Sequence, residues 1–579
     1  MDQPAASPPR AVSAARDLPV PMRDGTTLRA DVYTPEGPGR FPALLCRTPY
    51  DKTHPRYVRI AEALARSGYI AVVQDIRGRS ASDGDWTWHM STAGGELEAS
   101  DGYDSCEWAA VLDRCDGQVG TWGNSYPSWC IWHMAAARPP SLKTVFASGF
   151  AVREMDCTNG IFETGLRLRW QHHMAVSSRR KAGDMSYPRT VAEALHNWDG
   201  IERGKWLWHL PLDTIPDDLF GPDAAMQRRY WEEIAVEYWA LDRLHPRVAV
   251  PTCSLTGWWD RISGTADHYT GMVANGPAET RAEHRLIIGP WVHDVEGRGD
   301  WVGPRDYGPG ATTVHQDNLT RWYDYHLKGI DNGLGAEPPV KLFILNENRW
   351  RFEHEWPLAE AREIEYFLHS DGGANTPAGN GELSRDVPGA ERPDGYVYDP
   401  VDPVMSLIDP SGQISACDQL PLARRRDVLV YQTAPLEEDV LVIGHPRCHL
   451  WVASDCPDTD FLARLIEVGA DGLAVNISQG IVRARYRDGY DREVTLDPGT
   501  PTELVIRPLA VGIRFRCGSR IRLDVTSSDF PTFDRNHNTG RPFHTDAELR
   551  VARQTIFHDA AHPSRLVLPV LSVDGRSGE

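Results

Sequence analysis

The sequence predicts an α/β protein with three parts: a largely parallel sheet covered by helices, a helical insertion and a C-terminal all-β domain. Apolar strand-like runs alternate with helical patterns over residues 18–150 and again over 246–356, which is typical of a parallel sheet covered on both faces. Residues 151–245 lack β-branched runs and carry polar-aromatic helical patterns. Residues 357–579 contain short strands with turn signals between them, a composition typical of a β-sandwich or jelly roll.

The net charge of the chain limits the kinds of molecule that it is expected to bind. The chain has 579 residues and a formal charge of −20, which argues against nucleic acid and anionic membranes because both attract basic surfaces. No apolar run approaches the length of a membrane span. Residues 1–17 are rich in Ala, Pro and Ser and predict a disordered leader rather than a secretory signal. The ten cysteines have no Cys-x-x-Cys spacing, so we expect reduced thiols and a cytoplasmic protein.

The elements of the first part follow in order. A hairpin is expected where two strand patterns flank the turn Arg23-Asp24-Gly25. Beyond it, strands and helices alternate up to a sharp turn at Ser125. The expected strands are 18–22, 27–33, 41–47, 69–74 and 119–122, and the expected helices are 56–67 and 103–112.

The insertion and the later parts are predicted in the same way. Helical patterns cover 162–174 and 224–244, in a region crowded with tryptophans that we expect mostly to pack between helices. The sheet then resumes with strands at 248–255, 285–289 and 340–345, and the domain closes near Trp356-Pro357. The β domain is expected to contain strands at 428–431, 448–453, 461–468, 503–506 and 521–526.

The turn Gly123-Asn124-Ser125 follows a predicted strand and precedes an apolar helical pattern. A serine on such a sharp strand-to-helix turn presents its hydroxyl above the sheet, at the positive end of the helix. A small residue such as Gly123 suits the crowded turn. Ser125 is therefore a candidate nucleophile, although a Gly-x-Ser turn also arises by chance in a chain this long.

Two further candidates lie directly beyond strands. Asp260 follows the strand at 248–255, and His293 follows the strand at 285–289. Side chains in these positions gather at the carboxyl edge of a parallel sheet. The chain order Ser…Asp…His is the one expected of an α/β-hydrolase. Taken singly, Asp260 could be a helix cap and His293 a loop histidine.

Several motifs together resemble one family. They are Met22-Arg23-Asp24-Gly25, Arg47-Thr48-Pro49-Tyr50-Asp51-Lys52, Gly123-Asn124-Ser125-Tyr126, Gly257-Trp258-Trp259-Asp260, Gly289-Pro290-Trp291-Val292-His293, Ser527-Ser528-Asp529-Phe530-Pro531 and Phe533-Asp534-Arg535-Asn536. In this order and over nearly the whole chain, they are similar to the cocaine esterase / X-prolyl dipeptidyl peptidase family of serine hydrolases. The resemblance implies an α/β-hydrolase domain (18–150 and 246–356), a helical cap (151–245) and a C-terminal jelly roll (357–579).

The resemblance also implies the roles of the site residues. Ser125, Asp260 and His293 would form a catalytic triad, with the Tyr50 hydroxyl and the Tyr126 N–H binding the oxyanion. Trp170, Trp259 and Trp291 are the tryptophans we expect to contact substrate. The chain departs from the family where Ser128 replaces a glycine after Pro127. Because Pro127 falls in the first helical turn, where its missing N–H is not needed, we expect the helix still to start there.

Neither a metal nor a cofactor is predicted. His558 and His562 have the spacing of a zinc-binding pair but lack the accompanying glutamate, and we interpret them as loop residues. The adjacent His172 and His173 would point to different sides of a helix. No glycine-rich phosphate loop or dinucleotide fingerprint is present.

The expected partner is a small ester or amide, and homo-oligomerisation is compatible with the sequence. A free amino group would need carboxylates near the acyl pocket, for which Glu154, Asp156 and Glu163 are candidates. Because most acidic residues of so acidic a chain are solvated, we favour a carboxylic ester, with an aromatic ester among the options. A dipeptidyl peptidase or amino-acid ester hydrolase, an acyltransferase and an inactive carbohydrate-binding protein are the alternatives.

Overall fold

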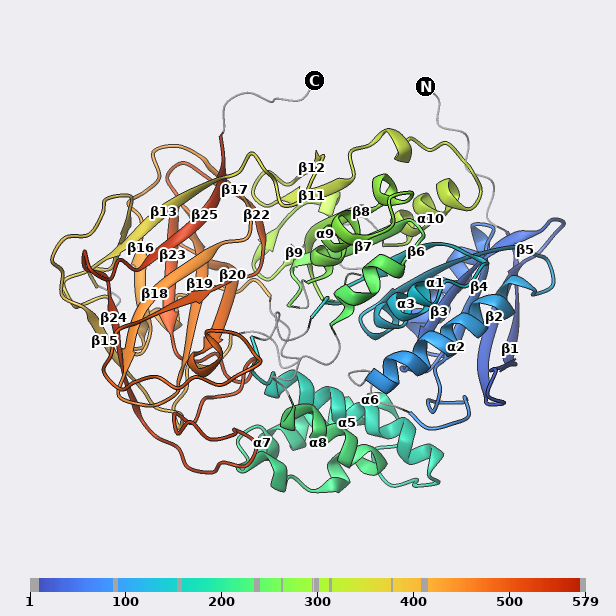
Figure 1. The fold of residues 1–579 in the computed structure, drawn as a ribbon, viewed down its shortest axis with the longest axis horizontal. Helices are drawn as coiled ribbons and strands as arrows, with labels where there is room; N and C mark the ends of the chain where they lie inside the picture. The colour runs from blue at the N-terminus through green and yellow to red at the C-terminus, as the bar shows by residue number, and fades with distance from the viewer. Residues whose placement is uncertain are drawn as a thin grey trace.

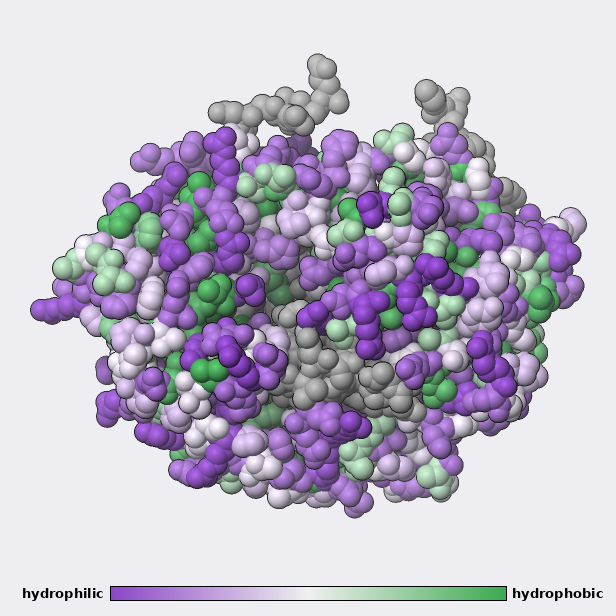
Figure 2. All heavy atoms as spheres, viewed as in Figure 1, coloured by the Kyte–Doolittle hydropathy of each residue, from purple (hydrophilic) through white to green (hydrophobic). Residues whose placement is uncertain are grey.

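The computed structural model forms three bodies (Figure 1): a sheet with helices on both faces, a group of helices beside it and a separate all-β domain. It describes residues 10–86, 92–153, 159–233, 240–261, 264–293, 295, 301–311, 315–375, 379–407 and 415–572. The mainly parallel sheet and the separate all-β domain confirm the predicted fold class. The face drawn in Figure 2 is largely hydrophilic, with scattered apolar side chains.

The first sheet has ten strands in the order β1-β2-β4-β3-β5-β6-β7-β8-β11-β12. From β4 through β11 neighbouring strands pair in parallel, and antiparallel strands close both edges. The strands are β1 (Val12–Pro21), β2 (Thr27–Pro35), β3 (Phe41–Thr48), β4 (Ile70–Asp75), β5 (Cys115–Asn124), β6 (Leu142–Ser148), β7 (Thr252–Trp259), β8 (Arg285–Val292), β11 (Val340–Ile344) and β12 (Arg349–Glu353). A separate two-stranded sheet joins β9 (Trp301–Val302) to β10 (Arg305–Asp306).

Helices cover both faces of this sheet. On one face, α1 (Pro55–Arg66) and α10 (His315–His326) pack together against residues such as Trp122. On the other, α2 (Thr92–Ala110) and α3 (Tyr126–Ala137) share an apolar core that includes Met272 of α9 (Thr265–Asn275). Because helices cover both faces, every residue of β3, β4 and β7 is buried.

The predicted disordered leader is wrong for residues 12–17. These residues belong to β1, which pairs antiparallel with β2 from Val12↔Pro35 to Pro21↔Thr27. Most side chains of β1 are exposed, as an edge strand allows. Such a strand needs no apolar alternation, so its composition resembled that of a disordered segment.

The insertion consists of short helices: α5 (Thr164–Lys181), α6 (Val191–Asn197), η1 (Trp198–Glu202), α7 (Arg203–Trp206), α8 (Ala224–Glu232) and several 3₁₀ turns. The single helix expected over 224–244 is wrong. The helix α8 ends at Glu232, residues 234–239 lie outside the described part, and Leu241–Arg247 forms the 3₁₀ helix η5. Pro246 inside η5 disfavours an α-helix, because it lacks an N–H and restricts the residue before it.

The C-terminal domain is a 13-stranded network, almost entirely antiparallel. Its strands are β13 (Arg362–His369), β14 (Glu382–Ser384), β15 (Asp394–Tyr398), β16 (Leu429–Gln432), β17 (Val440–Gly444), β18 (Arg447–Ser454), β19 (Asp460–Val468), β20 (Ala474–Arg483), β21 (Thr502–Ile506), β22 (Val511–Phe515), β23 (Arg520–Thr526), β24 (Ala552–Phe557) and β25 (Arg565–Leu571). Each of the five strands expected in this domain lies within one of them or overlaps it. No described helix of the chain is long and apolar enough to cross a membrane.

The two large domains share one apolar core, which includes Trp258 and Trp259 of β7 together with side chains of the C-terminal strands. Trp259 donates from Nε1 to the carbonyl of Asn476 in β20 at 3.2 Å. The backbone of Leu345, just beyond β11, also exchanges hydrogen bonds with Gly512 and Arg514 of β22. The strand that leads to Asp260 is thus fixed from both domains.

His284 links the starts of β7 and β8. Its Nδ1 accepts hydrogen bonds from the Thr252 N–H at 3.3 Å and from the Thr252 hydroxyl at 3.0 Å. Only 1% of the residue is exposed. Burial, with smaller contributions from Arg285, His245 and Arg281, lowers the pKa of His284 to about 4.

His284 should therefore make stability depend on pH. Because its pKa is depressed in the folded protein, the stabilisation is complete above the ordinary pKa of about 6.5 and is lost as the pH falls toward 4. Replacing His284 with Asn keeps an acceptor without the titration. Between pH 7 and 4, wild type should lose about 3 kcal/mol more than His284→Asn in the first thermal or urea transition. An exposed control, His354→Asn, should track wild type; parallel curves for wild type and His284→Asn would contradict the prediction.

Candidate active site

Ser125 lies between β5 and α3 in a strained backbone conformation, with φ 65° and ψ −127°. Its N–H donates to the carbonyl of Ser148 at the end of β6, at 3.0 Å. A Cβ on Gly123 would come within 2.5 Å of Pro127 Cβ, so the turn requires glycine there. Pro127 lies in the first turn of α3, as expected, and Ser128 is buried. The geometry is that of a serine held on a strand-to-helix elbow.

Asp260 and His293 directly follow β7 and β8, which pair in parallel. His293 Nδ1 lies 2.9 Å from Asp260 Oδ1. The other oxygen of Asp260, Oδ2, accepts a hydrogen bond from the Thr256 hydroxyl at 2.9 Å, and the carboxylate is fully buried. Because an ionised carboxylate only accepts, the proton of His293 is fixed on Nδ1, which leaves Nε2 able to accept a proton.

Asn124 joins the serine turn to the histidine loop. Its Nδ2 donates to the backbone carbonyl of His293 at 3.2 Å. Since Asn124 directly precedes Ser125, the two loops are tied at the residues that carry the chemistry. The sequence did not predict that Asn124 would bond the histidine loop or that Thr256 would bond Asp260, although both residues lie close in sequence to predicted site residues.

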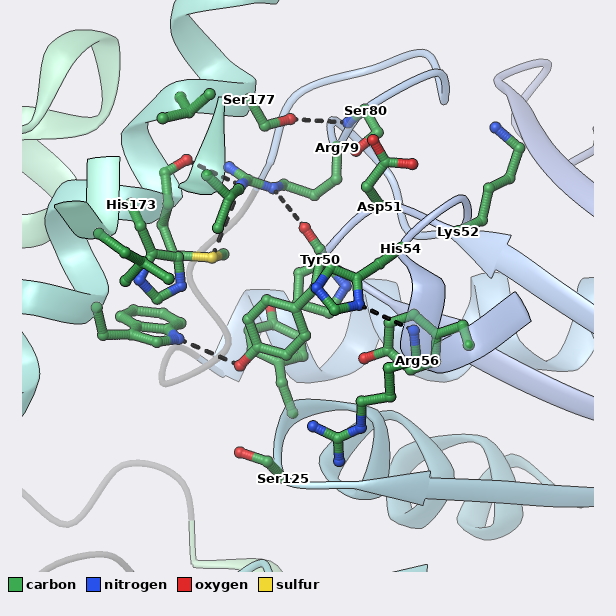
Figure 3. A pocket seen from close by; sticks show the side chains of 18 of the residues that line it. Tyr50, Asp51, Lys52, His54, Arg56, Arg79, Ser80, Ser125, His173 and Ser177 are labelled. Atoms are coloured by element: carbon green, nitrogen blue, oxygen red, sulfur yellow. Dashed lines mark hydrogen bonds between the residues drawn. The ribbon is translucent and has the colours of Figure 1, made fainter. Parts of the chain in front are cut away.

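A cavity of about 980 Å³ opens at this edge of the sheet. It is lined by Ser125, His293, Tyr126, Tyr50 and Trp170, among other residues. In Figure 3, Ser125 approaches from the end of its strand, while Tyr50 enters from a separate loop. The cavity thus brings together the predicted serine, histidine and tyrosines, and Asp260 lies behind the histidine.

The Tyr50 hydroxyl faces both the cap and the serine. Trp170 of α5 donates from Nε1 to Tyr50 Oη at 3.2 Å (Figure 3). Burial raises the pKa of Tyr50, while its hydrogen bonds with Trp170 and Ser125 oppose that shift. The hydroxyl therefore keeps its proton at neutral pH and can donate to a developing negative charge.

Trp259 and Trp291 are not among the residues that line the cavity, contrary to the prediction that they contact substrate. Trp259 is fully buried against the C-terminal domain. Trp291 is also buried and donates from Nε1 to the carbonyl of Ala311 at 3.0 Å. Both lie close to triad residues in sequence, but Trp259 packs into the core that β7 shares with the C-terminal strands, and Trp291 packs into the core beneath α1 and α10. Trp170 alone of the three lines the cavity.

Glu163 is held in a buried cluster beside His293. Its carboxylate lies 2.9 Å from Arg261 Nε and 3.0 Å from Arg167 Nη2. Burial raises the pKa of Glu163, and Arg261 and His293 oppose the rise. Of the carboxylates expected to receive an amino group, Glu154 and Asp156 lie outside the described residues, and Glu163 already faces two guanidiniums.

The remaining histidine candidates have structural contacts. On α5, His172 Nδ1 is 3.1 Å from the Leu219 carbonyl and His173 Nδ1 is 3.2 Å from the Arg169 carbonyl. His558 lies in a loop after β24, and its two ring nitrogens are each 3.1 Å from a carboxylate oxygen, one of Glu391 and one of Asp394. The described residues contain no group of three or more His, Cys, Asp or Glu side chains placed to hold a metal ion.

Comparison with known proteins finds relatives along nearly the whole chain. A family model described as X-Pro dipeptidyl-peptidase (S15 family) matches residues 24–294, and one described as X-Pro dipeptidyl-peptidase C-terminal non-catalytic domain matches residues 332–567. The chain is 33% identical over 592 residues to a cocaine esterase of Rhodococcus sp., covering 96% of this chain and 99% of that protein. The chain belongs to the cocaine esterase / X-prolyl dipeptidyl peptidase family.

This family member is a serine hydrolase, and its relatives support ester hydrolysis. Its fold is shared by an aminopeptidase from the marine sediment archaeon Thaumarchaeota archaeon, with a TM-score of 0.82 and 22% identity over 99% of this chain and 98% of the other. An α-amino acid ester hydrolase superposes with a TM-score of 0.76 at 24% identity, covering 98% of both chains. These two structures support the fold alone.

The hydrogen bond from Thr256 to Asp260 gives a test of the site's geometry. Thr256→Val keeps the side-chain shape but removes the donor to Oδ2, so Asp260 should hold His293 less firmly. We expect kcat/KM for an ester to fall about 10-fold, because a hydrogen bond to a charged group is lost. Thr270→Val, which removes a hydroxyl from α9 away from the cavity, serves as the control. Equal kinetics in the two variants would show that the Thr256 hydroxyl does not support the carboxylate.

Proposed function

We propose that this serine hydrolase cleaves a carboxylic ester through a Ser125–His293–Asp260 triad and an acyl-enzyme intermediate. The observation that carries the proposal is the 2.9 Å contact between His293 and Asp260 at a cavity that Ser125 also lines. No single residue would suffice. Ser125, His293 and Asp260 follow β5, β8 and β7 at one sheet edge, and a hydroxyl, an imidazole and a carboxylate at one edge support a triad.

The reaction has two halves. In the first, Ser125 Oγ attacks the ester carbonyl carbon while His293 Nε2 takes the hydroxyl proton. The tetrahedral intermediate collapses, the C–O bond to the alcohol breaks, and His293 returns the proton to the leaving alkoxide. In the second, His293 removes a proton from water, which attacks the acyl-enzyme, and Ser125 leaves with that proton. Asp260 stabilises the imidazolium in both halves.

The oxyanion would be stabilised from two sides. The Tyr50 hydroxyl lies in the cavity beside Ser125, and the Tyr126 N–H begins α3, where N–H groups have no acceptor within the helix. Donors fixed in a partly dehydrated site stabilise the developing negative charge without reorganising. The raised pKa of Tyr50 keeps its proton available.

The cavity favours an ester over a peptide with a free amino end. Glu163, the described carboxylate expected to receive an ammonium group, is paired with Arg261 and Arg167. Among the described residues that line the cavity, Asp51 is the single acidic one. An ammonium group would therefore meet little negative charge in this part of the cavity.

Replacing Ser125 with Ala should abolish hydrolysis of 4-nitrophenyl butyrate and labelling by a fluorophosphonate probe, because the nucleophile is gone. The thermal transition should not fall, since alanine deletes only the hydroxyl. The same panel should include Gly-Pro-4-nitroanilide and an added alcohol as acyl acceptor. Retained turnover in Ser125→Ala would refute the triad. Preference for the anilide, or an ester product with the added alcohol, would instead favour a peptidase or an acyltransferase.

Tyr50→Phe should lower kcat about 100- to 1000-fold while KM changes little, because the hydroxyl acts mainly on the transition state. The ring that packs against Tyr126 at a centroid distance of 6.4 Å is preserved. Tyr57→Phe, which removes a buried hydroxyl bonded to Thr48, is the matched control. A fall in kcat/KM that came entirely from KM would indicate a substrate-binding role instead.

A further inference from the structure

The cavity is basic although the protein is strongly acidic. The chain carries a formal charge of −20, yet lysine and arginine far outnumber acidic residues among the described lining residues, where Asp51 is the sole acid. In an acidic protein, a local excess of cations at a ligand site is a departure from the average surface. The positive charge of the cavity would attract anionic ligands.

Most of these cations have structural partners. Lys52 Nζ lies 3.1 Å from Asp75 Oδ2, and Arg169 pairs with both oxygens of Asp199 at 3.0 Å. Arg79 donates to the carbonyls of Pro49 and Met174, and to the Ser178 hydroxyl, at 2.9–3.2 Å. Figure 3 shows Arg79 beside Tyr50 and Ser80. Arg79 thus ties its loop to the cap helix α5, whereas Lys52 and Arg169 are paired within the sheet domain and within the cap.

Arg261 is different. It directly follows Asp260, lines the cavity and is only 4% exposed. Its Nε lies 2.9 Å from Glu163 Oε1 as an ion pair, but neither Nε nor the buried Nη1 makes a hydrogen bond to a described residue. Glu163 cannot serve Arg261 alone, because its other oxygen lies 3.0 Å from Arg167. Arg79, which ties loops to the cap, instead places its donors on two carbonyls and a hydroxyl.

We propose that Arg261 binds a carboxylate of the substrate, so that the preferred ester carries a second, anionic group. The inference rests on the proposed ester hydrolysis at Ser125. The guanidinium is planar, remains charged and presents paired donors that match a carboxylate. Because Arg261 adjoins the triad aspartate, the anion would lie within a short acyl or alcohol group of the scissile carbonyl. Arg261 is thus a specificity-determining residue, and the neutral part of the substrate would fill the rest of the cavity.

The test compares carboxylates with neutral isosteres on each side of the ester. The acyl arm uses monomethyl adipate and the methyl ester of adipic monoamide. The alcohol arm uses 4-acetoxybenzoate and 4-acetoxybenzamide. Methyl 6-aminohexanoate adds a cationic member of the acyl series. In wild type, one arm should favour the carboxylate in kcat/KM by about 10- to 100-fold, and the ammonium ester should be the poorest acyl substrate.

Arg261→Gln should reduce that carboxylate-to-amide ratio to near 1; the ratio is the readout because it cancels any effect of the substitution on turnover of both esters. Arg261→Lys should restore part of the ratio, since charge returns without the paired donors. Lys205→Gln, which removes an exposed cation of the cap outside the cavity, should keep the wild-type ratio. Should Arg261→Gln fail to fold, adipate should still inhibit hydrolysis of neutral esters by wild type more strongly than adipamide.

The outcomes separate the two proposals. One outcome is that neutral and carboxylate esters are cleaved equally well in both arms while a fluorophosphonate still labels Ser125. That result would overturn the role of Arg261 but would leave the proposal of ester hydrolysis standing. A carboxylate preference unchanged in Arg261→Gln would also overturn it and assign selectivity to another cation. Absence of both ester cleavage and labelling would refute the proposed function, and the inference would fall with it.

Discussion

Parallel pairing of β5, β6, β7 and β8 is the constraint on which the candidate site depends. It forces the chain to leave each strand at the same edge of the sheet, so residues far apart in sequence become neighbours. Ser125, Asp260 and His293 each occupy the first position after a strand. Their spacing is thereby set by backbone hydrogen bonds, and side-chain contacts such as those of Asn124 and Thr256 make the final adjustment.

The other two parts of the molecule act on this edge from opposite directions. The cap helix α5 reaches over it through the Trp170 contact with Tyr50 and the Arg79 contacts with α5. The C-terminal domain supports β7 from behind through the shared core and the Trp259 hydrogen bond. The described lining of the cavity therefore comes from the sheet domain and the cap, while the C-terminal domain supports β7 from outside the cavity.

Much of this arrangement could be predicted from the sequence. The alternation of apolar runs predicted the sheet, strand-end positions indicated Ser125, Asp260 and His293, and the family motifs indicated Tyr50. What failed was information that depends on tertiary environment. Trp259 and Trp291 lie close to site residues in sequence, but Trp259 is buried by the second domain and Trp291 by the helices α1 and α10. The edge strand β1 has too few buried side chains to leave a pattern. The pairing of Arg261 with Glu163 joins residues almost a hundred positions apart, and no local signal indicates it.

The backbone of Ser125 has a further consequence. At φ 65° and ψ −127° it occupies a region that glycine tolerates and serine does not favour, at a cost of about 1–3 kcal/mol. Glycine would suit the backbone conformation at this position better, but only serine supplies the hydroxyl. Keeping serine there for catalysis therefore lowers the stability of the fold. Selection for heat resistance that measures folding alone would therefore favour variants with glycine at position 125, which would be more stable and catalytically inactive.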